Sequence, residues 1–158
     1  MKVVGIDPGL AGTGIGIIEG RGRDIHGYSF GSISTCSKES TPVRLNIIYS
    51  KINSFLEQQK PDLVVLEDIY SLEKYPGSGI MLGKVSGVLL LAAHKAGVDI
   101  REISVREVKK IISGNGSADK YQVERSVRHV LGHGEPIRPF HASDALGLAL
   151  TGLYRYGK

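Results

Sequence analysis

Cysteine is almost absent from this sequence, because Cys36 is the only one among 158 residues. A lone thiol excludes an internal disulfide, and its Ser/Thr-rich surroundings offer neither a nearby His nor a second thiol. Long apolar runs are also missing: the longest strictly apolar stretch near the middle, Val88 to Ala93, is far too short to span a bilayer. No charged leader precedes an apolar stretch, so we expect a soluble, cytoplasmic protein.

Linkers, internal repeats and low-complexity segments are missing from the sequence as well. Its 158 residues, of which 41% are hydrophobic, suffice for one compact domain with one well-formed core. We therefore expect a single domain that covers residues 1–158.

The net charge of +4 is unevenly distributed. Residues 1–100 carry ten Lys and Arg against ten Asp and Glu, whereas residues 101–158 carry ten against six. The whole positive excess therefore lies in the C-terminal third. This asymmetry is typical of a surface that meets a polyanion, although a generic basic surface explains it equally well.

Short runs rich in β-branched residues and bounded by turn-forming residues predict five strands. The first three follow one another closely, which favours an antiparallel meander. The fourth is apolar without alternation, as in a strand covered on both faces, and parallel pairing with the first strand is the economical arrangement. We expect the strands near residues 2–7, 14–19, 25–34, 63–66 and 99–103.

Apolar residues at helical spacing predict five helices. A Thr41 N-cap followed by Pro42 opens the first, Ser104 and Glu107 form a capping box for the third, and Ser117 caps the fourth. The order of elements indicates an α/β protein whose mixed five-stranded sheet is flanked by helices. We expect the helices near residues 41–60, 79–96, 104–113, 117–131 and from 140 onward.

Glycines recur every four residues in the second predicted helix, at Gly79, Gly83 and Gly87. At this spacing they share one face, where another backbone can approach closely. Either the sheet or a second subunit would pack there, and a dimer interface at Gly83 and Gly87 is one of these two interpretations.

Acidic residues end two predicted strands, where a carboxylate loses hydration unless a cation compensates its charge. Asp7 and Glu67 have this position, and they lie close together if their strands are neighbours. Asp68 is the weaker candidate, because strand side chains alternate between faces. His141 and Asp144, three residues apart, project from one face of the last helix.

Each of these residues has an ordinary explanation when taken alone. Asp7 could begin a turn, Glu67 could lie on the surface, and His141 could cap the last helix. Only their convergence would indicate chemistry, because imidazole and carboxylate together are ligands for Mn²⁺ or Mg²⁺.

Four motifs follow one another along nearly the whole chain: residues 5–9 (GIDPG), Glu67 with an aromatic at Tyr70, residues 114–120 (GNGSADK) and residues 141–146 (HASDAL). Their order and spacing resemble those of the bacterial RuvC family of Holliday junction resolvases. The first motif is weak by itself, because actin-like ATPases and sugar kinases open with a similar loop. The glycine-serine motif with its lysine makes the set specific.

The resemblance implies a ribonuclease H-like fold, a homodimer and two divalent ions per active site, Mg²⁺ with Mn²⁺ as an alternative. It implies that Asp7, Glu67, His141 and Asp144 are the catalytic metal ligands. Many relatives have aspartate at the position of His141, and a neutral imidazole shifts the preference of the site toward softer metals. Four-way junction DNA as substrate and the branch-migration proteins RuvA and RuvB as partners are implied as well.

A second group of residues is expected to contact DNA. Lys109, Lys110 and Lys120 flank the Gly-Asn-Gly break, and amides near Ser117 open a helix, so this segment suits phosphate contact. In the family, lysines that match Lys109 and Lys120 lie at the DNA surface, and an aromatic that matches Tyr70 is thought to stack on bases. Solvated helix charges and packing at the sheet edge are the alternative explanations.

One segment departs from the family pattern. Within residues 75–87, Tyr75 stands where the family has asparagine, and Ser86 stands where it has arginine. The DNA contacts of this segment therefore do not carry over, and Lys84 is a candidate for the replacement charge.

Together these inferences predict an endonuclease that resolves Holliday junctions by paired symmetric nicks. Two metal ions would support phosphodiester hydrolysis to a 5′-phosphate and a 3′-hydroxyl, one activating water and the other stabilising the leaving oxygen. No Ser-His-Asp or Cys-His arrangement in the sequence offers a protein nucleophile. The alternatives are a non-catalytic branched-DNA binding module and a ribonuclease H-like nuclease acting on other nucleic-acid structures. An actin-like phosphotransferase would need two lobes, for which the chain is too short.

Overall fold

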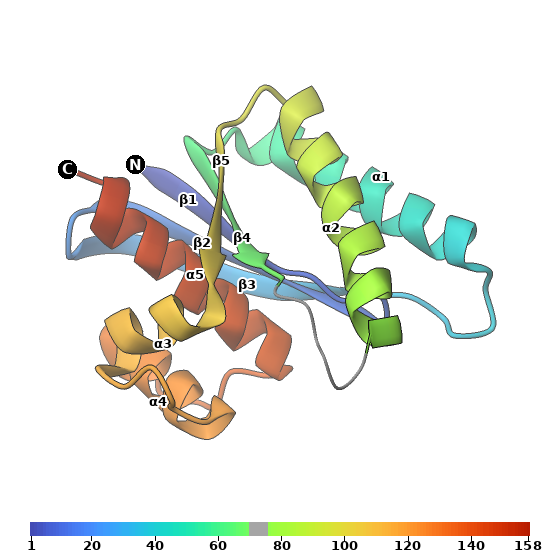
Figure 1. Cartoon of the computed structure of the whole chain (residues 1–158). Coiled ribbons are helices and arrows are strands. Elements are labelled where there is room, and N and C mark those ends of the chain that lie inside the picture. Colours follow the sequence, from blue (N-terminus) through green and yellow to red (C-terminus); the bar gives the residue numbers. More distant parts are fainter. Residues whose placement is uncertain (70–75) are drawn as a thin grey trace.

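The computed structural model of the chain describes residues 1–69 and 76–158. Its strands are β1 (Lys2–Asp7), β2 (Gly12–Arg21), β3 (Asp24–Ser34), β4 (Leu63–Asp68) and β5 (Ile100–Ser104). Its helices are α1 (Thr41–Gln59), α2 (Pro76–Lys95), α3 (Val105–Ser113), α4 (Lys120–Leu131) and α5 (Phe140–Tyr156). In Figure 1 the sheet separates α1 and α2 from α3, α4 and α5, which gives three layers.

The sheet has the strand order β3-β2-β1-β4-β5. The first three strands form the expected antiparallel meander, and β4 pairs with β1 and β5 in parallel. The register of β1 and β4 places Ile6 opposite Leu66. Asp7 and Glu67 follow these two residues, and therefore they end neighbouring strands at the same edge of the sheet.

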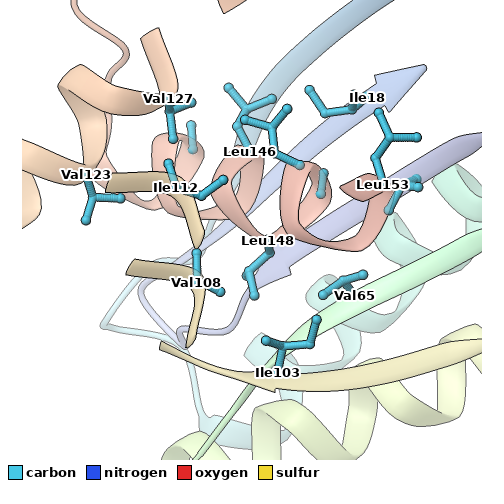
Figure 2. Close-up of a cluster of buried hydrophobic side chains, with 14 of the residues drawn as sticks. Ile18, Val65, Ile103, Val108, Ile112, Val123, Val127, Leu146, Leu148 and Leu153 are labelled. Carbon is cyan, nitrogen blue, oxygen red and sulfur yellow. The ribbon is translucent and has the colours of Figure 1, made fainter. Parts of the chain in front are cut away.

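Alternation along the strands divides the core between the two faces. Val3 and Val65 pack in the layer of α3, α4 and α5, whereas Val4 and Ile6 pack against α1 and α2. Figure 2 shows the first of these clusters, in which Leu146 and Leu153 of α5 lie near Ile18. Both faces are therefore buried, and this explains why the run 63–66 is apolar without alternation.

The observed helix N-caps agree only partly with those predicted from the sequence. Ser104 caps α3 as expected, because its hydroxyl accepts a hydrogen bond from the Glu107 amide at 3.3 Å. The expected capping box is only half formed, since the Glu107 carboxylate pairs with Arg155 instead. The N-cap of α1 is Ser40 rather than Thr41, and no side-chain bond closes it. The prediction for α4 was wrong in the same way: Asp119, not Ser117, is its N-cap. A carboxylate accepts amide hydrogen bonds more strongly than a hydroxyl does, and Asp119 directly precedes the first residue of the helix.

Helix α2 is the one helix of the described residues that is long and apolar enough to cross a membrane. Length and composition alone are weak evidence, because a helix that packs against protein passes the same test. Large apolar side chains of α2 are exposed, including Ile80 and Leu91. This face has no cover within the described part of the chain.

Candidate active site

Strand alternation directs two carboxylates toward α5. Asp7 has the same parity along β1 as Val3, and Glu67 has the same parity along β4 as Val65, whose side chains pack on the α5 face. Asp68 points to the opposite face, where it lines a groove beside α2. The prediction that Asp68 lies apart from the other two acids is therefore confirmed.

Glycines on β1 and β2 let α5 lie directly on the sheet. A Cβ atom on Gly5 would clash with the Ala145 carbonyl oxygen, and one on Gly14 would clash with the His141 carbonyl oxygen. A Cβ atom on Gly16 would lie 2.7 Å from the backbone nitrogen of Leu146. These glycines bring the first turns of α5 down to the strand ends.

Sequence reasoning missed this role of the glycines. Gly14 and Gly16 alternate along β2 with Ile15 and Ile17, which point to the other face. Two residues without side chains on one face of a strand indicate a close backbone approach, and this signal was available in the sequence.

The result is a cluster of four side chains from three elements. His141 Nδ1 lies 2.5 Å from Asp7 Oδ2, a hydrogen bond between residues 134 positions apart in the chain. The Asp7 side chain is 11% exposed and that of His141 is 49% exposed, so the cluster opens to solvent on the histidine side. Glu67 and Asp144 together line a small cavity next to this pair, with Lys109 of α3 at its wall.

Burial and mutual repulsion oppose ionisation of these acids. Burial raises the pKa of Glu67 from 4.5 to about 8, and the charges of Asp7 and Asp144 add to the effect. Burial, followed by the charge of Asp7, raises the pKa of Asp144 to about 6, while His141, Lys109 and Lys120 act in the opposite direction. The hydrogen bond to Asp7 raises the pKa of His141 above 6.5. The cluster thus concentrates negative charge that a bound cation would stabilise.

The donor set matches the chemistry of a divalent metal ion, since carboxylate oxygens and an imidazole nitrogen are ligands for Mg²⁺ and Mn²⁺. The side chains as they stand are not arranged as ligands: within residues 1–69 and 76–158, no group of three or more His, Cys, Asp or Glu could hold an ion. The hydrogen bond between Asp7 and His141 occupies Oδ2 of the acid and Nδ1 of the imidazole. Metal binding through these two atoms would require the side chains to rotate.

The residues expected at the DNA lie around this cluster. Lys109 lines the cavity with Glu67 and Asp144, whereas Lys110, the next residue of α3, is exposed and does not. Lys120 is the first residue of α4, and Ser117 is exposed in the loop before it. The expected stacking residue, Tyr70, lies outside the described residues.

Comparison with known proteins decides what this arrangement is. The statistical model of the family described as "Crossover junction endodeoxyribonuclease RuvC" matches residues 3–152. A protein of that name from Carboxydothermus hydrogenoformans is 37% identical over 159 residues, 99% of this chain and 98% of the relative. The chain belongs to the RuvC family.

Other members support the same assignment. The RuvC of Prosthecochloris aestuarii is 36% identical over 153 residues, 97% of this chain and 81% of the relative. A solved structure described as Thermus thermophilus RuvC in complex with Holliday junction substrate has a TM-score of 0.90 at 30% identity, covering 98% of this chain and 94% of that one. The expected fold of the family, ribonuclease H-like with a mixed five-stranded sheet, is confirmed.

Gly83 and Gly87 of α2 pack closely against none of residues 1–69 and 76–158. Both are exposed, and a Cβ atom on either would meet nothing within 4 Å. They line a groove of about 670 Å³ together with Ile80, Ser86 and Leu90. Of the two interpretations of these glycines, packing against the sheet is therefore wrong.

Proposed function

We propose that this chain is a metal-dependent endonuclease that resolves Holliday junctions by paired symmetric nicks. The observation that carries the proposal is the convergence of Asp7, Glu67, His141 and Asp144 in a member of the RuvC family. Asp7, Glu67 and the pair on α5 are far apart in the sequence, so only the fold brings them together. A purely structural role is a poor explanation, because the cluster opposes its own ionisation.

Divalent cations are the cofactors we propose for this cluster: two Mg²⁺ ions per active site, with Mn²⁺ as an alternative. Asp7, Glu67, His141 and Asp144 would hold them. Bound ions would lower the pKa of the attacking water and stabilise charge on the leaving 3′ oxygen, giving a 5′-phosphate and a 3′-hydroxyl.

Protons on the protein compete with these cations. A proton in the hydrogen bond between Asp7 and His141 must leave before His141 Nδ1 can act as a ligand. Glu67 must also lose its proton before it can bind a cation. Because its pKa is raised to about 8, Glu67 is still largely protonated near neutral pH. We therefore expect activity to rise with pH through the neutral range, as the ligands become available.

We propose that the DNA lies over the face that carries Lys109, Lys110, Ser117 and Lys120, with Tyr70 stacking on bases. The two cations nearest the acids, Lys109 and Lys120, offset part of the repulsion between the phosphate backbone and the carboxylates. Positive charge beside a carboxylate cluster allows one surface to bind both metal and DNA.

A homodimer is the state in which we propose the enzyme works, with the face of α2 around Gly83 and Gly87 as its interface. Ile80 is 64% exposed and Leu91 49% exposed, which is unusual for large apolar residues on a monomer. Exposed glycines beside them would let the two copies of α2 approach closely. A four-way junction has near two-fold symmetry, so a symmetric dimer would present one active site to each of two strands.

The dimer is tested by Gly87→Leu, which places a bulky side chain in the proposed interface at a position where a Cβ atom meets none of the described residues. We expect this variant to elute as a monomer in gel filtration and to nick junctions poorly. Gly134→Leu is the matched control, because Gly134 is also exposed with nothing within 4 Å of a Cβ atom. An intact dimer for Gly87→Leu would contradict the interface.

The function itself is tested with a synthetic four-way junction and a linear duplex of matched sequence, each with Mg²⁺, Mn²⁺ or chelator. We expect symmetric nicks on the junction alone, with metal only, and none with Asp7→Asn. Equal binding with and without metal and no cleavage would instead identify a non-catalytic junction-binding module. Cleavage of other branched or RNA-containing substrates in preference would identify a different ribonuclease H-like nuclease.

The remaining family properties are part of the same proposal. We propose that the chain is a single nuclease domain over residues 1–158 that acts in the cytoplasm in DNA recombination and repair. RuvA and RuvB are its proposed branch-migration partners.

A further inference from the structure

Two basic side chains converge on one aromatic ring directly beside the candidate active site. The ring belongs to Phe140, the residue before His141. The guanidinium carbon of Arg138 lies 4.1 Å from its centroid, and the ammonium nitrogen of Lys120 lies 4.9 Å from it. Both distances are within the range in which an aromatic ring attracts a cation.

A second ring holds Phe140 in place. The Tyr121 ring packs edge to face against it, with centroids 5.1 Å apart and an interplanar angle of 87°. The Lys120 ammonium also lies 5.4 Å from the centroid of Tyr121. The two rings and two cations thus form one unit, made from the start of α4 and the start of α5.

This unit lies at the rim of the carboxylate cluster. Val123 of α4 lines the same small cavity as Glu67 and Asp144. Lys120 is three residues earlier in α4 and therefore projects from the same side, one turn closer to the start of the helix. Phe140 is adjacent to His141, so both ends of the unit are anchored next to proposed metal ligands.

Of the two cations, only Arg138 forms an ion pair among the described residues, a long one with Glu124, whose carboxylate lies closer to Arg128 at 3.1 Å. Among the described residues, the carboxylate nearest to Arg138 is that of Glu124, 4.0 Å away. Glu124 is buried, and its carboxylate already accepts a hydrogen bond from the Ile137 amide at 2.9 Å. No acidic group within residues 1–69 or 76–158 forms an ion pair with Lys120.

Backbone amides at the start of α4 are not free to bind an anion instead. The Asp119 carboxylate accepts hydrogen bonds from the amides of Tyr121 and Gln122. The Asp119 amide donates to the Gln122 side chain, and the Ser117 amide donates to the Asn115 side chain. The expectation that this helix start binds phosphate through its amides is therefore weakened, and attraction for an anion must come from side chains.

We propose that Phe140 is a positioning residue that holds Lys120 and Arg138 together as a clamp for backbone phosphates of the DNA strand entering the active site. The inference rests on the proposed nuclease function and adds a contact to it. In this role the ring would act through the two cations and not on the scissile bond itself. It acts by restricting two flexible side chains before DNA arrives, so less side-chain freedom is lost on binding.

The clamp affects binding more than chemistry, and this decides the experiment. Phe140→Leu removes the ring face but keeps apolar volume, and Phe140→Tyr retains the ring. Tyr156→Leu is the matched control, because Arg155 lies 5.7 Å from the Tyr156 centroid at the opposite end of the same helix. Each protein is titrated with fluorescent four-way junction in chelator at several salt concentrations, and KM and kcat are then measured with Mg²⁺.

We expect Phe140→Leu to weaken junction binding and raise KM about fivefold to tenfold, with a smaller change in kcat. The slope of log affinity against log salt concentration should become shallower by about one, since a phosphate contact is loosened. Phe140→Tyr should restore both values, and Tyr156→Leu should change neither. An unchanged salt slope for Phe140→Leu, or no restoration by Phe140→Tyr, would overturn the clamp.

Two further arms keep the outcomes distinct. If thermal melting shows that Phe140→Leu is not folded, Arg138→Gln replaces it. An unchanged salt slope for Arg138→Gln then overturns the proposal. If the wild-type protein binds junctions but never cleaves them, the nuclease function fails, while the salt slopes still decide whether the clamp exists.

Discussion

Replacing Glu67 by glutamine should make the metal-free protein more stable. The pKa of Glu67 is about 8 in the folded chain, against 4.5 for the ordinary carboxyl group, with burial as the main cause. The folded state therefore retains a proton that the unfolded chain has already released between these two values. Stability contributed by this proton is fully present below pH 4.5 and is lost as pH rises toward 8. Glutamine resembles the protonated acid and remains neutral.

The magnitude follows from the difference between the two pKa values. At pH 7 the raised pKa of Glu67 lowers the free energy of unfolding by about 3 kcal/mol relative to its value below pH 4.5, since one pKa unit corresponds to about 1.4 kcal/mol. Neighbouring carboxyl groups share the proton and water reaches the site, so we expect a measured gain of about 1–2 kcal/mol. For a domain of this size that gain corresponds to roughly 3–6 °C in Tm.

The assay is thermal unfolding of wild type and Glu67→Gln in chelator at pH 4.5, 6, 7 and 8. The difference in Tm should be near zero at the lowest pH and should grow with pH. Saturating Mn²⁺ should stabilise the wild type and should stabilise the variant much less, because a ligand is lost. Glu39→Gln, at an exposed loop position, is the control. A variant no more stable than wild type at pH 8 without metal would refute the reasoning.

Three other substitutions test separate parts of the site. Gly14→Ala should lower stability by about 2–4 kcal/mol and abolish cleavage, because its Cβ atom meets the His141 backbone. Gly31→Ala is the control, because a Cβ atom there has open space and should be tolerated. Equal melting temperatures for the two variants would contradict the close approach of α5. His141→Asp should lower the ratio of Mn²⁺-supported to Mg²⁺-supported cleavage, since oxygen replaces nitrogen in the ligand set, and an unchanged ratio would argue against a ligand role. Lys109→Gln should weaken junction binding and reduce the salt slope by about one, whereas an unchanged slope would place this lysine away from the phosphates.

Local patterns were sufficient to predict the sheet and to single out the clustered residues, because Asp7 and Glu67 end strands and His141 and Asp144 share one helix face. The apolar run at 63–66 indicated a strand buried on both faces, and parity along that strand separated Glu67 from Asp68. These inferences succeeded because strand periodicity depends only on neighbouring residues. The cap of α4 was harder, because Ser117 and Asp119 both precede the helix and the outcome depends on their geometry.

Tertiary contacts could not be predicted in the same way. The hydrogen bond between Asp7 and His141 joins residues 134 positions apart, and it depends on how far α5 descends onto the sheet. That distance is set by the bare glycine faces of β1 and β2 rather than by α5 itself. The convergence of Lys120 and Arg138 on the Phe140 ring is also a tertiary contact, because it requires the starts of α4 and α5 to meet.

Anomalous X-ray diffraction from crystals soaked in Mn²⁺ tests the central claim most directly. The account predicts manganese peaks bounded by Asp7, Glu67, His141 and Asp144, with the hydrogen bond between residues 7 and 141 replaced by bonds to metal. Peaks elsewhere in a protein that still cleaves junctions, or a cluster that stays hydrogen-bonded as described at saturating Mn²⁺, would contradict it.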